Sequence, residues 1–192
     1  MKSKYIEDAE LDRVKRHIGG RRDNLLLVAE LTGMRIGDVV KIRVEDLDSD
    51  GVRYTAEKTG KTGRAPLPRA LVRSLRKQAL DGWCFPSPYK RGQHITRQAA
   101  WARIKKAADR AGVEPAGISP HSLRKVYGVK KYQSEGMEAA RRALQHSDAR
   151  VTEIYALSDW LTGTNAELPL YRKDLPIIIE KIVDTIKLFI DK

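Results

Sequence analysis

A chain of 192 residues, 41% of them hydrophobic, can bury the core of one globular domain, and its single cysteine, Cys84, excludes a disulfide framework and a cysteine-based zinc cluster. The longest apolar runs are too short to span a bilayer, and the N-terminal residues lack the apolar core of a signal peptide. The net charge of +12 lies entirely in residues 1–159, because residues 160–192 hold five basic and five acidic residues. This positive excess indicates either a surface that merely keeps the protein in solution or a polyanionic partner. Among polyanionic partners, nucleic acid fits better than a membrane, because the basic residues do not gather on one amphipathic helix.

The N-terminal part of the chain predicts two helices followed by an unusual arginine. Glu7–Ile18 has an apolar face at helical spacing, and Asp23–Leu31 is a second helix that Gly33 closes. Arg35 then begins a short helix, where the helix dipole disfavours a cation. An arginine at this position makes sense if an anion binds there.

A β-hairpin is predicted around the sequence T-G-K-T-G. Val52–Glu57 and Arg64–Leu67 are its strands, and the connection carries Lys61 close to Lys58. A phosphate-binding loop is excluded because Thr55 stands where that motif needs its first glycine. The G-x-x-G loop that clamps nucleic acid fits the letters but belongs between two helices.

Two further helices and a short strand are predicted in the middle of the chain. Arg69–Leu80 is a helix with a basic flank, and Trp83–Pro86 is a candidate third strand before a polar loop. Thr96 is the N-cap of a helix that runs to Ala111. The basic residues of this last helix are spread around it, so that some face a partner's phosphates and others face water.

The C-terminal half holds two histidines, an arginine and a tyrosine in a helical context. Ser119 and Pro120 form a good helix start, which places His121 in the first turn and Arg124 one turn later on the same face. The predicted helix Met137–Leu144 leads to His146, and the predicted helix Val151–Leu157 carries Tyr155. Of seven tyrosines, only Tyr155 follows the pattern T-x-x-Y.

These motifs, taken in order from Leu26 to Asp159, resemble the active site of the tyrosine recombinase (phage integrase) family. They are T-G-M-R-I-G-D, the lysine-bearing hairpin, H-S-L-R, Q-H and T-E-I-Y. Two positions depart from the family pattern: Lys125 stands where a second histidine is common, and Gln145 where glycine is usual.

The resemblance implies an α+β fold that is mostly α-helical, like a tyrosine recombinase catalytic domain, with a small antiparallel sheet at one edge. We expect this catalytic domain in residues 1–159 and a linker with a C-terminal amphipathic helix in residues 160–192. Family members usually carry a separate core-binding domain before the catalytic one. Nothing of that kind precedes Tyr5, so we expect either an isolated catalytic domain or a short recombinase.

The resemblance also implies the catalytic residues. They are Arg35, Lys58, His121, Arg124, His146 and Tyr155. The arginines bind the scissile phosphate, the tyrosine attacks it, His121 accepts the proton, His146 donates a hydrogen bond and a lysine protonates the leaving oxygen. The family pattern K-T-G-K-x-x-R-x-P-L-P places this lysine at Lys58, with Lys61 as the alternative. An acidic residue one turn after the first arginine usually supports it, and here this is Asp38. No metal or other cofactor is expected.

Double-stranded DNA is the partner that the resemblance implies, bound by a homo-oligomer that is a tetramer in synapsis. We expect further DNA contacts from Lys61, Arg64, Arg97, Lys105 and Lys125. The amphipathic helix that begins at Pro176 packs either on its own domain or in trans on a neighbouring protomer. Such a protein would work in the cytoplasm of a prokaryotic, archaeal or phage-infected cell, at the nucleoid, in the recombination or integration of a mobile element.

Three alternatives compete with this interpretation. A type IB topoisomerase shares the tyrosine chemistry, but the hairpin and the H-x-x-R pattern are more similar to integrases. A non-catalytic DNA-binding protein on the same fold would lack the nucleophile or a phosphate-binding arginine, and neither is missing. An RNA-binding protein would need exposed stacking aromatics, of which two Phe and three Trp are a small supply.

Overall fold

The computed structural model describes residues 6, 8–17, 24–115 and 118–144. The predicted helices at 151–157 and 176–190, together with His146 and Tyr155, lie outside the described residues. The helices are α1 Asp8–His17, α2 Leu25–Thr32, α3 Ile36–Val39, α4 Arg69–Gln78, α5 Arg97–Arg110, α6 Pro120–Glu135 and α7 Met137–Ala143, with a 3-10 helix η1 at Val44–Asp46, and the strands are β1 Gly51–Thr55 and β2 Thr62–Pro66. Within these ranges every helix is too short or too polar to cross a membrane.

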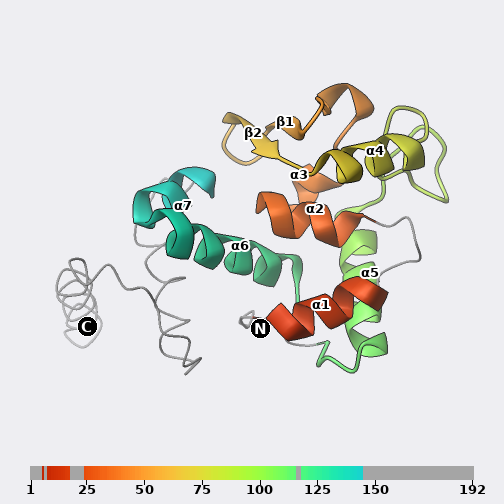
Figure 1. Cartoon of the computed structure of the whole chain (residues 1–192). Coiled ribbons are helices and arrows are strands. Elements are labelled where there is room, and N and C mark those ends of the chain that lie inside the picture. Colours follow the sequence, from red (N-terminus) through yellow and green to blue (C-terminus); the bar gives the residue numbers. More distant parts are fainter. Residues whose placement is uncertain (1–5, 7, 18–23, 116–117, 145–192) are drawn as a thin grey trace, which may run out of the picture.

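Helix α2 lies in the middle of the domain and is apolar around most of its circumference. It packs against α6, which in turn carries α7, and on its other sides it meets α3 and β2 (Figure 1). Helix α1 packs across α5. The core joins Leu26 and Val28 of α2 to Ile104 of α5 and to Leu123 and Val126 of α6, all fully buried. The apolar stripes that the sequence shows at helical spacing are therefore the faces that meet in the core.

The helix ends follow the predicted local signals. The Thr96 side chain accepts a hydrogen bond from the Ala99 N–H at 3.1 Å and begins α5. Ser119 forms a capping box with Ser122, and Pro120 occupies the first turn of α6. Gly33 ends α2 in the left-handed conformation, with φ of 61°.

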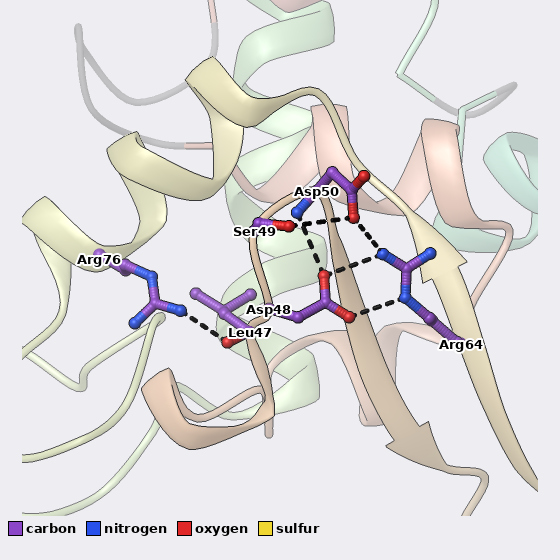
Figure 2. A network of polar contacts seen from close by, with 6 residues as sticks. All are labelled: Leu47, Asp48, Ser49, Asp50, Arg64 and Arg76. Atoms are coloured by element: carbon purple, nitrogen blue, oxygen red, sulfur yellow. Dashed lines mark hydrogen bonds and ion pairs between the residues drawn. The ribbon is translucent and has the colours of Figure 1, made fainter.

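The predicted hairpin is confirmed as the antiparallel pair β1–β2, with Tyr54 opposite Gly63. Figure 2 shows what holds its open end: Arg64 of β2 binds Asp48 at 2.7 and 2.9 Å and also pairs with Asp50. Hydrogen bonding from Arg64 lowers the pKa of Asp48 to about 2. Next to this cluster, Arg76 of α4 donates a hydrogen bond to the Leu47 carbonyl at 2.6 Å. The base of the hairpin is thus joined to the segment before β1, and that segment to α4.

The prediction of a third strand at Trp83–Pro86 is wrong. Asp81 and Gly82 both have positive φ, 51° and 82°, and form a two-residue turn in which Leu80 and Trp83 exchange two backbone hydrogen bonds. Trp83 also pairs with Arg43, but only as an isolated bridge. Cys84 and Phe85 of this run are buried, and Trp83 and Pro86 beside them form only isolated bridges, so the run is a buried connecting segment and not a strand.

Candidate active site

A cavity of about 450 Å³ brings together residues that are distant in the sequence. It is lined by Arg35 and Ile36 at the start of α3, by Arg97, Gln98 and Trp101 of α5, and by Ser119, Pro120, His121 and Arg124 at the start of α6. Three of the predicted catalytic residues, Arg35, His121 and Arg124, therefore share one cavity. Arg97, one of the predicted DNA contacts, lies at the same place.

Arg35 reaches the cavity because the chain turns sharply after α2. It is the N-cap of α3, with an extended backbone (φ −64°, ψ 143°), and it is partly exposed. The turn depends on Gly33, because a Cβ there would overlap Cδ1 of Tyr127, which packs against it from α6. The prediction that a glycine frees the backbone for Arg35 is confirmed, and the structure adds the close contact with Tyr127.

We expect Gly33→Ala to lower the free energy of unfolding by roughly 2–5 kcal/mol. The left-handed backbone contributes about 1–2 kcal/mol of this cost, and the overlap with Tyr127 about 1–3 kcal/mol. Urea denaturation of the full chain measures the change. Gly60→Ala is the matched control, because Gly60 also has positive φ, 64°, but no atom within 4 Å of its added Cβ. Equal losses in the two variants would contradict the contact with Tyr127.

Arg124 is almost fully buried and connects three segments of the site. Its Nη1 donates to the carbonyl of Gly33, and its Nη2 donates to the carbonyl of Leu144. Gly33 comes two residues before Arg35, and Leu144 two residues before His146. A charged guanidinium makes stronger hydrogen bonds than a neutral donor. Arg124 therefore fixes the end of α2 and the end of α7 in addition to facing the cavity.

His121 lies in the first turn of α6, lines the cavity and is largely exposed. Partial burial lowers the pKa of its imidazole, and the positive charges of Lys125, Arg124 and Arg35 lower it further. A histidine with a pKa below its usual value is neutral at pH 7 and can accept a proton. The cavity thus combines the guanidinium cations of Arg35 and Arg124 with a histidine that is neutral at pH 7.

The hairpin is held beside α3 through Glu57. Its N–H donates to Oδ1 of Asp38 at 3.0 Å, and its carboxylate pairs with Lys41 at 2.9 Å. Lys58 follows at once, exposed in the turn. Asp38, which we expected to support Arg35, is therefore a backbone anchor for the hairpin. Lys61 lines a second cavity of about 490 Å³, with Tyr54, Tyr127 and Arg142.

The other predicted DNA contacts are placed differently from one another. Arg97 is exposed at the cavity, and Lys105 lies two turns further along the same stripe of α5. Lys125 is partly buried, which lowers its pKa. Arg64 binds two carboxylates at the open end of the hairpin, so its charge is neutralised locally. A DNA contact by Arg64 stays a prediction, and its ion pairs reduce the charge available for it.

Trp101 is a cavity residue that the sequence analysis missed. It is 46% exposed although it is the largest apolar side chain of α5. Its position four residues after Arg97 and four before Lys105 was a signal, because this spacing places all three on one helical stripe.

The fold is that of a tyrosine recombinase catalytic domain. It resembles the crystal structure of the XerA recombinase, with a TM-score of 0.68 and 19% identity over 82% of this chain and 62% of that chain. It also resembles a lambda integrase tetramer bound to a Holliday junction, with a TM-score of 0.63 and 15% identity over 81% of this chain and 48% of that chain.

Sequence comparison leads to the same family. Residues 7–160 match the model of the phage integrase family. The tyrosine recombinase XerD of Rhizobium meliloti is 32% identical over 145 residues, which are 70% of this chain and 46% of the relative. The chain belongs to the phage integrase family, and it spans about half the length of the curated relatives that it matches.

Proposed function

We propose that this protein is a site-specific DNA recombinase in which Tyr155 attacks a scissile phosphodiester. The observation that carries the proposal is the meeting of Arg35, His121 and Arg124 around one cavity. Attack forms a 3′-phosphotyrosyl bond and releases a 5′-hydroxyl. A second 5′-hydroxyl then attacks this bond and religates the strand, so that neither metal nor ATP is needed.

The two arginines bind the non-bridging oxygens of the phosphate. A planar guanidinium can offer two parallel N–H donors to such a group. The effect is largest on the pentacoordinate transition state, where negative charge accumulates on these oxygens. Arg124 is held by two backbone carbonyls and is therefore preorganised before DNA arrives.

Within the described ranges no tyrosine lines the cavity, which supports a nucleophile from elsewhere in the chain. Tyr54 and Tyr127 line the second cavity, Tyr89 lies exposed in the loop after Trp83, and Tyr132 lies on α6 outside the lining of both cavities. Burial raises the pKa of Tyr127, which makes its phenolate harder to form. Among the tyrosines outside the described ranges, Tyr155 is the candidate nucleophile, because it follows the family's T-x-x-Y pattern. His146 would donate a hydrogen bond to a phosphate oxygen.

Cleavage should lose rate on the acid side of pH 6.5 because protonated His121 cannot accept the phenol proton. The lowered pKa of His121 places this loss below 6.5, so that activity is complete at pH 7. The same shift makes folding less favourable as the pH falls below 6.5, since the unfolded chain binds the proton more tightly. Single-turnover cleavage between pH 5 and 8 measures the effect. The residual cleavage rate of His121→Gln should no longer fall below pH 6.5. If it falls as in the wild type, the proton acceptor is another group.

Lys58 is the proposed proton donor to the 5′-oxygen, supported by the anchoring of its neighbour Glu57 to Asp38 of α3. We expect a substrate with sulfur in place of the leaving oxygen to restore cleavage by Lys58→Ala, because a thiolate leaves without a proton. Lys61→Ala is the matched control and should show no such rescue. If the sulfur substrate restores only Lys61→Ala, the roles of the two lysines are exchanged.

The proposed partner is duplex DNA, bound by more than one protomer. The basic excess of residues 1–159 supports DNA binding, and a structurally similar integrase has been seen as a tetramer on a Holliday junction. We further propose that the segment from Pro176 docks in trans when DNA is bound. Such a protein would act in the cytoplasm at the nucleoid, in the recombination or integration of a mobile element.

The decisive experiment is a trap for the covalent intermediate. A pool of nicked duplexes with randomised sequence loses a short 5′-hydroxyl fragment on cleavage, so that religation fails. Denaturing electrophoresis should reveal a protein–DNA adduct, and sequencing it identifies the site. No adduct at any sequence would favour a non-catalytic DNA-binding protein. Relaxation of supercoiled plasmids without sequence preference would favour the topoisomerase alternative.

A further inference from the structure

Trp101 is an exposed tryptophan that lies outside the buried face of α5. In the described part of the chain, the exposed large hydrophobic residues are Leu31, Leu80, Tyr89 and Trp101. Of these, only Trp101 lines the cavity that holds Arg35, His121 and Arg124. The buried face of α5 is supplied by other residues, Ala100, Ile104, Ala107 and Ala108. Packing of the core therefore does not account for a tryptophan at this position.

Trp101 is the middle residue of a stripe that alternates cation, ring and cation. Arg97, Trp101 and Lys105 follow one another at intervals of four residues on α5. The Lys105 ammonium lies 4.9 Å from the centre of the Trp101 ring. The Arg97 side chain passes over Gly37 of α3, where an added Cβ would lie 3.0 Å from its Cδ. The stripe thus begins beside α3 and leads away from Arg35.

The dimensions of the stripe suit a strand of DNA. Eight residues of an α-helix rise by about 12 Å, which along the duplex axis corresponds to roughly three to four nucleotide steps of one strand. Cations bind phosphates, and an aromatic ring packs against a sugar or a base whatever the sequence. A strand with its scissile phosphate between Arg35 and Arg124 would place its neighbouring nucleotide over α5.

We propose that Trp101 is a DNA-contact residue whose indole packs against the nucleotide next to the scissile phosphate, while Arg97 and Lys105 bind the flanking phosphates. This inference rests on the proposed function, since it needs the scissile phosphate in the cavity. It adds an apolar contact with the nucleotide itself to a site otherwise built from charges.

The first test reads Trp101 directly by its fluorescence. In the full chain with Trp83→Phe and Trp160→Phe, Trp101 is the sole tryptophan. Titration with a 20-base-pair duplex should quench or shift its emission, with binding followed independently by the anisotropy of a label on the DNA. Inorganic polyphosphate, which offers phosphates without sugar or base, should bind without this change. DNA binding that leaves the emission unchanged would overturn the inference.

The second test compares variants at two exposed aromatic residues. Trp101→Ala should weaken duplex binding by about 5- to 150-fold, the range for loss of one aromatic contact with a nucleotide. Trp101→Phe should retain most of the affinity. Tyr89→Ala is the matched control, since Tyr89 is 93% exposed and lies outside the cavity. Wild-type affinity in Trp101→Ala, or an equal loss in Tyr89→Ala, would contradict the proposal.

The two proposals fail in different ways. The adduct formed by the wild-type chain tests the proposed function, and the emission of Trp101 on DNA binding tests the contact. An unperturbed Trp101 in a protein that forms the adduct overturns only the contact. A wild-type protein without any adduct overturns the proposed function, and the contact next to a scissile phosphate with it.

Discussion

Tyr155→Phe is expected to abolish the covalent protein–DNA adduct while it leaves DNA affinity within about twofold of the wild type. The substitution removes only the nucleophilic oxygen, and the cationic residues that bind phosphates stay in place. The adduct is measured on a denaturing gel with a nicked substrate, and affinity by the anisotropy of labelled duplex. Removal of this one oxygen should therefore separate the covalent step from DNA binding.

Tyr127→Phe is the control for this experiment. Tyr127 lies near Arg124 in sequence but packs against Gly33 and lines the second cavity. It should retain the adduct at the wild-type level. An adduct that survives in Tyr155→Phe and disappears in Tyr127→Phe would transfer the role of nucleophile to Tyr127.

Arg35→Ala and Arg124→Ala should each slow single-turnover cleavage by about 100- to 1,000-fold, the loss expected for one donor to a transition-state oxygen. Their effects on folding should differ. Arg35 is partly exposed, so its removal costs little stability. Arg124 is buried and serves the carbonyls of Gly33 and Leu144, so its removal should cost about 2–4 kcal/mol of unfolding free energy.

Arg73→Ala is the matched control, because Arg73 is an exposed arginine of α4 outside the cavity. It should retain both the cleavage rate and the urea midpoint. A wild-type cleavage rate in Arg35→Ala would remove this residue from the site. Equal urea midpoints for Arg35→Ala and Arg124→Ala would show that the two carbonyl contacts of Arg124 contribute no net stability.

Local sequence signals proved reliable where the structure depends on neighbouring residues. Thr96 and Ser119 cap their helices as expected, and Gly33 ends α2 with positive φ. The hairpin at β1–β2 is also where the turn residues predicted it. A cap or a tight turn satisfies backbone groups within about four residues, so its residues can be recognised without knowledge of the rest of the fold.

Partners across the fold could not be predicted in this way. Arg64 was expected to bind DNA, and only the path of the chain before β1 brings Asp48 and Asp50 to it. Asp38 was expected to support Arg35, and only the docking of the hairpin on α3 gives it the Glu57 N–H. A charged side chain on the surface pairs with whichever group the packing brings near, and many pairings fit the same sequence.

By itself, the sequence determined the family, the order of the motifs and the helices on which Arg35, His121 and Arg124 stand. The tertiary structure decided that these side chains share one cavity, that Arg124 ties the end of α2 to the end of α7, and that Trp101 faces the same space. The reason is physical. The start of a helix and the face on which a residue lies follow from spacing along the chain. The neighbours of that face follow from how the helices pack, which depends on the shape of the whole core.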